Sequence, residues 1–262
     1  MWPAQALETY QCPDPSSRAK CGTNPSTDIS GLGAVLARAL ALPAAVGVDG
    51  ATTAAWAALL ASLPPLALAP SKKVKGAQAI QPVAPGYTEK RHNSENTALY
   101  AVHPFRAYGT GKPGLATAQA TYADRPSPCN NGWCQDVIDA AMLNFTDDAA
   151  KMVAQRAGAT SEFRFTGYAG HNQDYEPSLD HFSFMRTAMH YMLLGPLDDA
   201  KQSMLLFPTW PTKWDVDIKL RAPLQTTIEA ACINGTLTKL VVTPAARRAD
   251  IKVVNCANPS NL

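Results

Sequence analysis

The sequence predicts a mainly α-helical fold with a small antiparallel β unit at its C-terminus. Apolar residues recur at helical spacing in several segments between residues 28 and 200, whereas residues 215–220 alternate between apolar and polar and further β-rich runs follow them. Helices first and strands afterwards describe an α domain followed by a β domain. We therefore expect a Cys- and Pro-rich loop segment at 1–27, a helical domain at 28–200 and an antiparallel β domain at 201–262.

The expected helices have ordinary start and stop signals. Ser26-Thr27-Asp28 offers N-cap side chains to the first helix, and Pro43 ends it. The expected helices span residues 29–42, 52–63, 98–101, 113–123, 133–143, 147–157 and 180–194. The proline- and lysine-rich stretch 64–97 is expected to be a long surface loop, and loops of this length often form part of a site.

The expected strands lie at the C-terminal end. Residues 215–220 alternate, with Val216, Ile218 and Leu220 on one side. Asn234-Gly235 separates two further β-rich runs, 226–233 and 237–242, and is the strongest short-range signal of a hairpin. Residues 251–254 are expected to form a last strand.

The composition indicates a folded protein without a nucleic-acid or membrane partner. Of the 262 residues, 46% are hydrophobic and 17% are charged, which is typical of a globular chain. The formal net charge is +2, so electrostatics give no reason to expect nucleic acid or an anionic membrane as partner. No run of apolar residues is long enough to span a bilayer.

Six cysteines favour an oxidising compartment. They fall as three close pairs, although six cysteines allow about 15 connectivities and the pairing stays open. No zinc-site spacing is present. The sequons at Asn144 and Asn234 are compatible with a secreted protein. Because the first residues do not form a signal peptide, we expect the chain to begin partway through a longer secreted protein.

Asp180 is the first candidate catalytic residue. It is expected to begin the helix 180–194, after a segment rich in aromatic, histidine and amide side chains that suit sugar rings and hydroxyls. The alternative is that Asp180 only caps the helix. A metal site with His171 and His181 is disfavoured, because no metal-binding motif accompanies them. We expect no metal.

Two further segments offer candidate binding residues. The first, NNGWCQDVID, places Trp133, Gln135 and Asp136 where a loop meets a helix, although the tryptophan also suits a core and Asp136 the positive helix end. The second is HNSENTALYAVHPFR. Its polar residues could bind a ligand or simply cap local structure: His92, Asn93, Glu95 and Asn96.

Taken in order, several segments resemble the C-terminal half of a six-hairpin glycosidase of glycoside hydrolase family 95, the α-L-fucosidase and α-L-galactosidase family. The resemblance covers about residues 24–245. The matching segments are NPSTDISGLGAVL, AAWAALLASLPPL, HNSENTALYAVHPFRAYGTGKPGL, NNGWCQDVIDAAML, PSLDHFSFMRTAMHYML and LLFPTWPTKWDVDIKLRAPLQTTIEAA.

This resemblance implies a partial (α/α)6 toroid followed by the β domain, and inverting hydrolysis of a terminal fucose- or galactose-like sugar. Asp180, in SLDHF, matches the aspartate that polarises the water-activating asparagines of the family. Carboxylates run this chemistry, so no cofactor is expected. Candidate sugar contacts are His92, Asn96, His103, Trp133, Gln135 and His171.

The chain departs from the family at the general acid. The corresponding loop reads QCPDPSSRAKCG, so the nearest acid is Asp14, with Glu8 behind it. Half of the expected toroid is also absent, which would leave apolar helix faces exposed and make the chain associate. We therefore expect as partners a carbohydrate and the missing N-terminal half or another subunit. The alternative is a non-catalytic carbohydrate-binding or structural glycoprotein that retains the scaffold.

Overall fold

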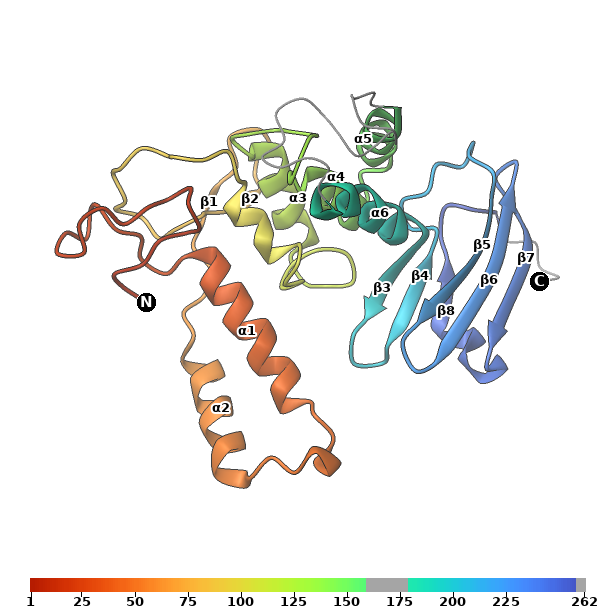
Figure 1. The fold of residues 1–262 in the computed structure, drawn as a ribbon, viewed down its shortest axis with the longest axis horizontal. Helices are drawn as coiled ribbons and strands as arrows, with labels where there is room; N and C mark the ends of the chain where they lie inside the picture. Colours follow the sequence, from red (N-terminus) through yellow and green to blue (C-terminus); the bar gives the residue numbers. More distant parts are fainter. Residues whose placement is uncertain (159–178, 258–262) are drawn as a thin grey trace. The chain divides into compact units, whose positions relative to one another are not determined.

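The computed structural model describes residues 1–158 and 179–257, and it describes the side chains of all of these except 179–182. The chain divides into two compact units (Figure 1). Unit 1 comprises Met1–Gly109 and Pro113–Pro128, and unit 2 comprises Thr110–Lys112 and Cys129–Leu262. The expected division at residues 27/28 and 200/201 stays a prediction.

Unit 1 combines a helical hairpin with a small sheet and a third helix. Its regular elements are α1 (Ser26–Leu40), the 3-10 turn Ala44–Val46, α2 (Gly50–Ser62), β1 (Leu68–Pro70), β2 (Gln78–Ile80), the 3-10 turn Thr97–Ala101 and α3 (Leu115–Asp124). The helices α1 and α2 lie side by side (Figure 1). The strands β1 and β2 pair antiparallel, and α3 packs against β2 and the 3-10 turn.

Local sequence explains both helices of the hairpin. The Asp49 carboxylate caps α2 by accepting a hydrogen bond from the backbone N–H of Thr52 at 2.8 Å. Gly31 allows α1 to meet the ring of Phe105, because a Cβ at this glycine would lie 2.9 Å from that ring. The N-terminal half of α1 is thereby fixed on the rest of unit 1, where Leu99 and Tyr122 are buried.

Unit 2 combines three helices with two sheets. Its regular elements are α4 (Asp136–Met142), α5 (Thr146–Gly158), α6 (Leu179–Leu193), β3 (Leu194–Asp198), β4 (Ser203–Leu206), β5 (Val216–Ala222), β6 (Thr226–Ile233), β7 (Thr236–Thr243), the 3-10 turn Ala245–Asp250 and β8 (Ile251–Val253). The helix α4 packs against α5 and α6. One sheet has the order β3-β4-β8 and the other is the meander β5-β6-β7.

The turn between β6 and β7 confirms the predicted hairpin. Asn234 and Gly235 have φ angles of 51° and 71°, so both lie in the left-handed region that a type I′ turn requires. Directly beside the turn, Ile233 pairs with Thr236. The burial pattern of β6 keeps Ile228 and Ala230 in the core of unit 2.

Three disulfides join the cysteines that are nearest in the sequence: Cys12–Cys21, Cys129–Cys134 and Cys232–Cys256. Bonds of this kind persist in oxidising compartments, so they are consistent with a secreted or extracellular protein. Within the described ranges, every helix is too short or too polar to cross a membrane.

The predicted fold class was wrong. A mainly α-helical partial (α/α)6 toroid followed by a small antiparallel β domain does not describe the chain, because helices and sheets occur together in both units. Unit 1 contains the β1–β2 ladder within the stretch that was expected to be loop. In unit 2, β8 pairs with β4 in parallel rather than extending an antiparallel unit. Helical spacing predicted most of the helices but carries no information on how they pack.

Candidate functional site

Unit 1 contains a pocket of about 380 Å³. Most of its lining comes from the stretch 64–97 that was expected to be a long surface loop, and α3 contributes Thr121 and Asp124. A volume of this size lies within the range of small-molecule sites, roughly 300–1,000 Å³. The pocket is therefore the candidate site of this unit.

Two tyrosines form an aromatic part of the pocket wall. Tyr10 comes from the N-terminal loop and Tyr87 follows the turn at Pro85-Gly86. Their ring centroids lie 5.7 Å apart in an edge-to-face arrangement, and the Tyr87 hydroxyl donates to the carbonyl of Gln11 at 2.9 Å. Burial raises the pKa of both phenols, so both stay neutral and present apolar faces with a polar edge.

Glu95 brings a carboxyl group to the pocket. Its Oε2 accepts a hydrogen bond from the hydroxyl of Thr9 at 2.9 Å. Burial raises the pKa of Glu95, and the charge of Glu8 acts in the same direction, against the opposing effect of the Thr9 bond. A half-buried carboxyl with a raised pKa can accept a ligand hydroxyl or donate a proton.

The second carboxylate of the lining, Asp124, is committed to local structure. Its oxygens accept hydrogen bonds from the Ser71 hydroxyl at 3.0 Å and from the backbone N–H groups of Lys72 and Lys73 at 2.8 and 2.9 Å. Its neighbour Arg125 stacks on the ring of Tyr122 at 3.6 Å. Asp124 therefore fixes the turn after β1 and has little capacity left to act as a base.

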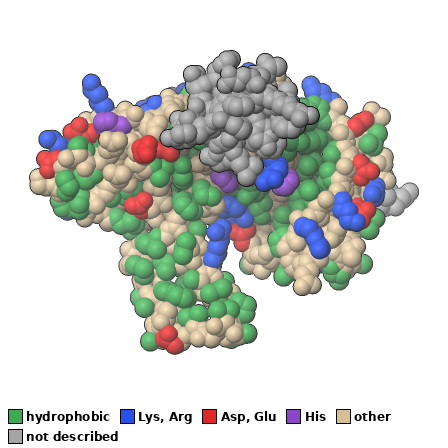
Figure 2. All heavy atoms as spheres, viewed as in Figure 1, with side chains coloured by type: hydrophobic (Ala, Val, Ile, Leu, Met, Phe, Trp, Pro, Cys, Tyr) green, Lys and Arg blue, Asp and Glu red, His purple; other side chains and the backbone are tan. Residues whose placement is uncertain are grey.

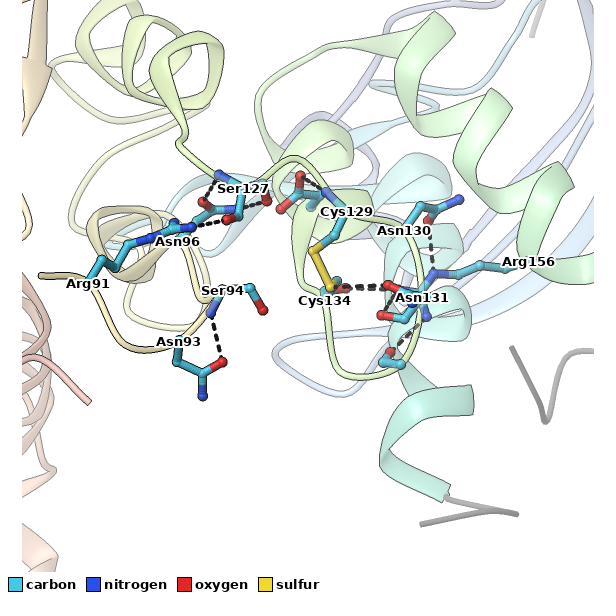
Figure 3. The surroundings of a disulfide bond; sticks show 12 residues. Arg91, Asn93, Ser94, Asn96, Ser127, Cys129, Asn130, Asn131, Cys134 and Arg156 are labelled. Atoms are coloured by element: carbon cyan, nitrogen blue, oxygen red, sulfur yellow. Dashed lines mark hydrogen bonds between the residues drawn. A yellow bond between two sulfur atoms is a disulfide. The ribbon is translucent and has the colours of Figure 1, made fainter. Parts of the chain in front are cut away.

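Asn96 and Thr97 complete the polar part of the lining. The Asn96 side chain holds Ser127 from both ends, donating to its carbonyl at 2.8 Å and accepting from its N–H at 3.2 Å, and Arg91 donates to the Ser127 hydroxyl (Figure 3). Thr97 is 1% exposed, and its hydroxyl has no hydrogen-bond partner among the described residues. Such a group suits a water or a ligand hydroxyl.

The charges of the lining balance. Lys72 and Arg125 are its basic residues, and Glu95 and Asp124 are its acidic residues. Tyrosine rings with single hydrogen-bonding groups around a pocket of no net charge suit a neutral, hydroxyl-rich ligand such as a sugar. In the parts of the chain that the structure describes, no group of three or more His, Cys, Asp or Glu side chains is placed to hold a metal ion.

Of the residues predicted for the site, Asn96 lines the pocket. Asp14 instead lies in the loop closed by Cys12–Cys21, where its side chain is 39% exposed. Its carboxylate accepts from the hydroxyl of Ser16 at 2.6 Å and lies 3.7 Å from the Lys20 ammonium. The Ser16 hydrogen bonds hold the pKa of Asp14 below its usual value, which suits a turn-capping carboxylate and not a proton donor.

The two histidines predicted in unit 1 lie outside the pocket lining. His92 is exposed in the loop before Glu95, and its backbone N–H donates to Thr9. His103 follows the 3-10 turn, where burial lowers the pKa of its imidazole to about 4. Glu8, the second candidate acid, is exposed and accepts a hydrogen bond from Asn93.

The remaining predicted residues belong to unit 2 or to undescribed positions. Trp133 lies in the loop closed by Cys129–Cys134, and Gln135 directly precedes α4. The Gln135 Oε1 atom is buried without a hydrogen-bond partner in the ranges that are described. Asp180 falls in the first turn of α6, but its side chain lies outside the described residues, as does His171 altogether.

The sequence prediction missed the two tyrosines, and it left Glu95 open as a capping residue. The available signal was the expectation that the long stretch 64–97 contributes to a site, because this stretch supplies Tyr87 and Glu95. No periodic pattern marks Tyr10, which reaches the pocket from the Cys- and Pro-rich N-terminal segment.

Comparison with known proteins gives no family. No family model matches the chain, and no curated protein matches it. The resemblance to glycoside hydrolase family 95 therefore stays a prediction.

Proposed function

We propose that the chain is a secreted carbohydrate-binding protein and that the pocket of unit 1 holds a neutral sugar. The observation that supports this most is the composition of the pocket wall. Two neutral tyrosine rings and several isolated polar groups line one pocket, and its acidic and basic residues are equal in number. The three disulfides agree with secretion. Binding without catalysis is favoured because Asp14 caps an exposed turn and Asp124 is occupied by three hydrogen bonds.

The test is a titration of the full chain with neutral monosaccharides and oligosaccharides, including L-fucose and galactose, followed by calorimetry. Tyr87→Ala removes one ring of the wall, and an aromatic contact of about 1.4 kcal/mol corresponds to a tenfold loss of affinity. Tyr87→Phe is the matched control, because it keeps the ring and removes only the hydroxyl that binds Gln11. Absence of saturable binding, or equal affinity of Tyr87→Ala and the wild type, would refute the proposal.

A second candidate function is inverting glycoside hydrolysis of a terminal fucose- or galactose-like sugar. The specific observation in its favour is Glu95, a pocket carboxyl whose pKa is raised by burial and which suits a general acid. Aryl α-L-fucosides and aryl galactosides test it. If the chain turns them over, Glu95→Gln is expected to lower kcat by at least about 100-fold while binding persists.

The resemblance to glycoside hydrolase family 95 makes a separate prediction for Asp180, which belongs to unit 2. Asp180→Asn should lower turnover strongly if this residue polarises the attacking water, as the family resemblance implies. A loss below about tenfold with the fold intact removes Asp180 from catalysis, because general base catalysis contributes roughly 100-fold or more. Binding without any turnover by the wild type leaves the carbohydrate-binding function alone.

A further inference from the structure

The connection and second helix of the α1–α2 hairpin expose an unusual amount of uncharged surface. No residue of α2 is buried, and every residue from 41 to 51 is exposed. Large apolar side chains are exposed along the whole hairpin: Val35 by 59%, Leu42 by 46%, Val46 by 57% and Leu59 by 44%. Figure 2 shows hydrophobic side chains over the face of this hairpin that is in view.

Charge is nearly absent from the same region. Between Arg38 and Lys72 the only charged side chain is Asp49, whereas 17% of the whole chain is charged. A surface helix of a monomer normally has one apolar and one charged face. In α2, alanine, leucine and tryptophan occur on every side, so α1 can cover only part of its apolar surface.

We propose that the α1–α2 hairpin is the surface through which two copies of this chain associate, the two hairpins packing as a four-helix bundle. Between Arg38 at the end of α1 and Lys72 this surface carries only the charge of Asp49, so it offers little to a charged partner, whereas its apolar side chains can pack against those of a second copy across a two-fold axis. Paired helical hairpins form bundles with short connections, and α1 and α2 are already such a pair.

The size of the hairpin brings it toward the range of a dimer interface. A 13-residue helix is roughly 20 Å long and two packed helices are roughly 20 Å wide, so the footprint of one hairpin face is on the order of 400 Å², to which the relief of its side chains adds. Specific interfaces bury about 800 Å² per partner. The exposed connection 41–49 adds to this area.

A lipid bilayer fits the hairpin less well than a second copy does. The helices have 15 and 13 residues, whereas about 20 are needed to cross the hydrocarbon core. A helix that lies in the membrane interface has a strongly charged, usually basic face. The distal part of the hairpin carries one base, Arg38, and one acid, Asp49, and therefore has no basic face for anionic headgroups.

The experiment is sedimentation equilibrium of the full chain with its disulfides intact. We expect a dimer at about 50 µM. Val35→Glu combined with Leu59→Glu should raise the dissociation constant by at least about 100-fold, because each copy would bring uncompensated carboxylates into the interface. Both positions are exposed in the single chain, so the fold should persist, and circular dichroism checks this.

The matched control is Leu224→Glu, which changes a leucine that is 60% exposed in unit 2. It should leave the dimer intact. A wild type that stays monomeric, or a dimer that the double hairpin substitution does not weaken, overturns the proposal. A monomer that floats with phosphatidylcholine vesicles also overturns it and identifies the bilayer as the occupant of the hairpin surface.

Discussion

Two short disulfide loops hold their polar groups in opposite ways. The loop closed by Cys12–Cys21 in unit 1 leaves Asp14 partly exposed, bonded to its near neighbours Ser16 and Lys20. The loop closed by Cys129–Cys134 in unit 2 surrounds a guanidinium group, that of Arg156, which is 9% exposed (Figure 3). Both loops are closed by a disulfide, but only the second loop is also bound by a buried charged side chain.

The Arg156 side chain binds its loop through most of its donors. It donates to the carbonyls of Gly132 at 3.0 Å and Cys134 at 2.9 Å, and its Nε donates to the Asn130 side chain at 2.9 Å. Burial lowers the pKa of Arg156 to about 10, an effect that the charge of Asp136 opposes, so the side chain stays charged at neutral pH. We therefore expect the hydrogen bonds of Arg156 to contribute most to the stability of the loop closed by Cys129–Cys134. In the loop closed by Cys12–Cys21 we expect the disulfide itself to contribute most.

The largest effect is expected from Arg156→Met. The substitution keeps an unbranched apolar stem but removes the guanidinium and leaves buried carbonyl oxygens without donors, which we expect to lower the free energy of unfolding by about 3 kcal/mol. Urea denaturation of the full chain measures this. The control Lys151→Met changes an exposed residue of the same helix, α5, and should stay within about 0.5 kcal/mol. A second control, Asp14→Asn in the loop closed by Cys12–Cys21, should leave the urea midpoint nearly unchanged. An Arg156→Met protein as stable as these controls would contradict the comparison.

Removal of the two disulfides sharpens the comparison. Chain entropy alone predicts a cost of roughly 2 kcal/mol for the loop of sequence separation 5 and roughly 0.5 kcal/mol more for the loop of separation 9. We expect the reverse order for the paired Cys→Ser variants, because opening Cys129–Cys134 also loosens the carbonyls around Arg156. Thermal denaturation of both variants gives the order. In the Arg156→Met protein, removal of Cys129–Cys134 should no longer destabilise more than removal of Cys12–Cys21. If it still does, the additional destabilisation does not come from the carbonyls around Arg156.

The sequence predicted local features well and long-range ones poorly. The hairpin at Asn234-Gly235 and the bounds of β6 were predicted because the turn residues themselves set the geometry. The strand β3 was missed because it continues α6 without a break, and β4 because a serine followed by three apolar residues carries no clear period. The parallel pairing of Met204 with Ile251 joins segments that no local pattern connects.

The candidate site divides in the same way. Asn96 and the stretch 64–97 were predicted from the polar residues and length of one continuous segment. The contact between Tyr10 and Tyr87 arises only when the N-terminal loop folds onto that segment. Asp14 was selected by its position in the resemblance, and a sequence does not show that its carboxylate is bound by Ser16.

The smallest of these effects is the pH dependence of unit 1, which has a partly buried basic side chain, His103. Burial lowers the pKa of His103 to about 4, against about 6.5 in an unfolded chain. Between these values the unfolded chain binds a proton that the folded chain does not, so stability is lost as the pH falls from 6.5 toward 4. Relative to pH 7, this group should lower the free energy of unfolding by about 2 kcal/mol at pH 5.

Urea denaturation at both pH values measures this difference. The variant His103→Gln, which cannot titrate, should show a smaller difference between the two pH values. Equal pH dependence of the two proteins would mean that the His103 imidazole is solvated in the folded chain. Of the two basic side chains compared, only Arg156 would then affect stability through its burial.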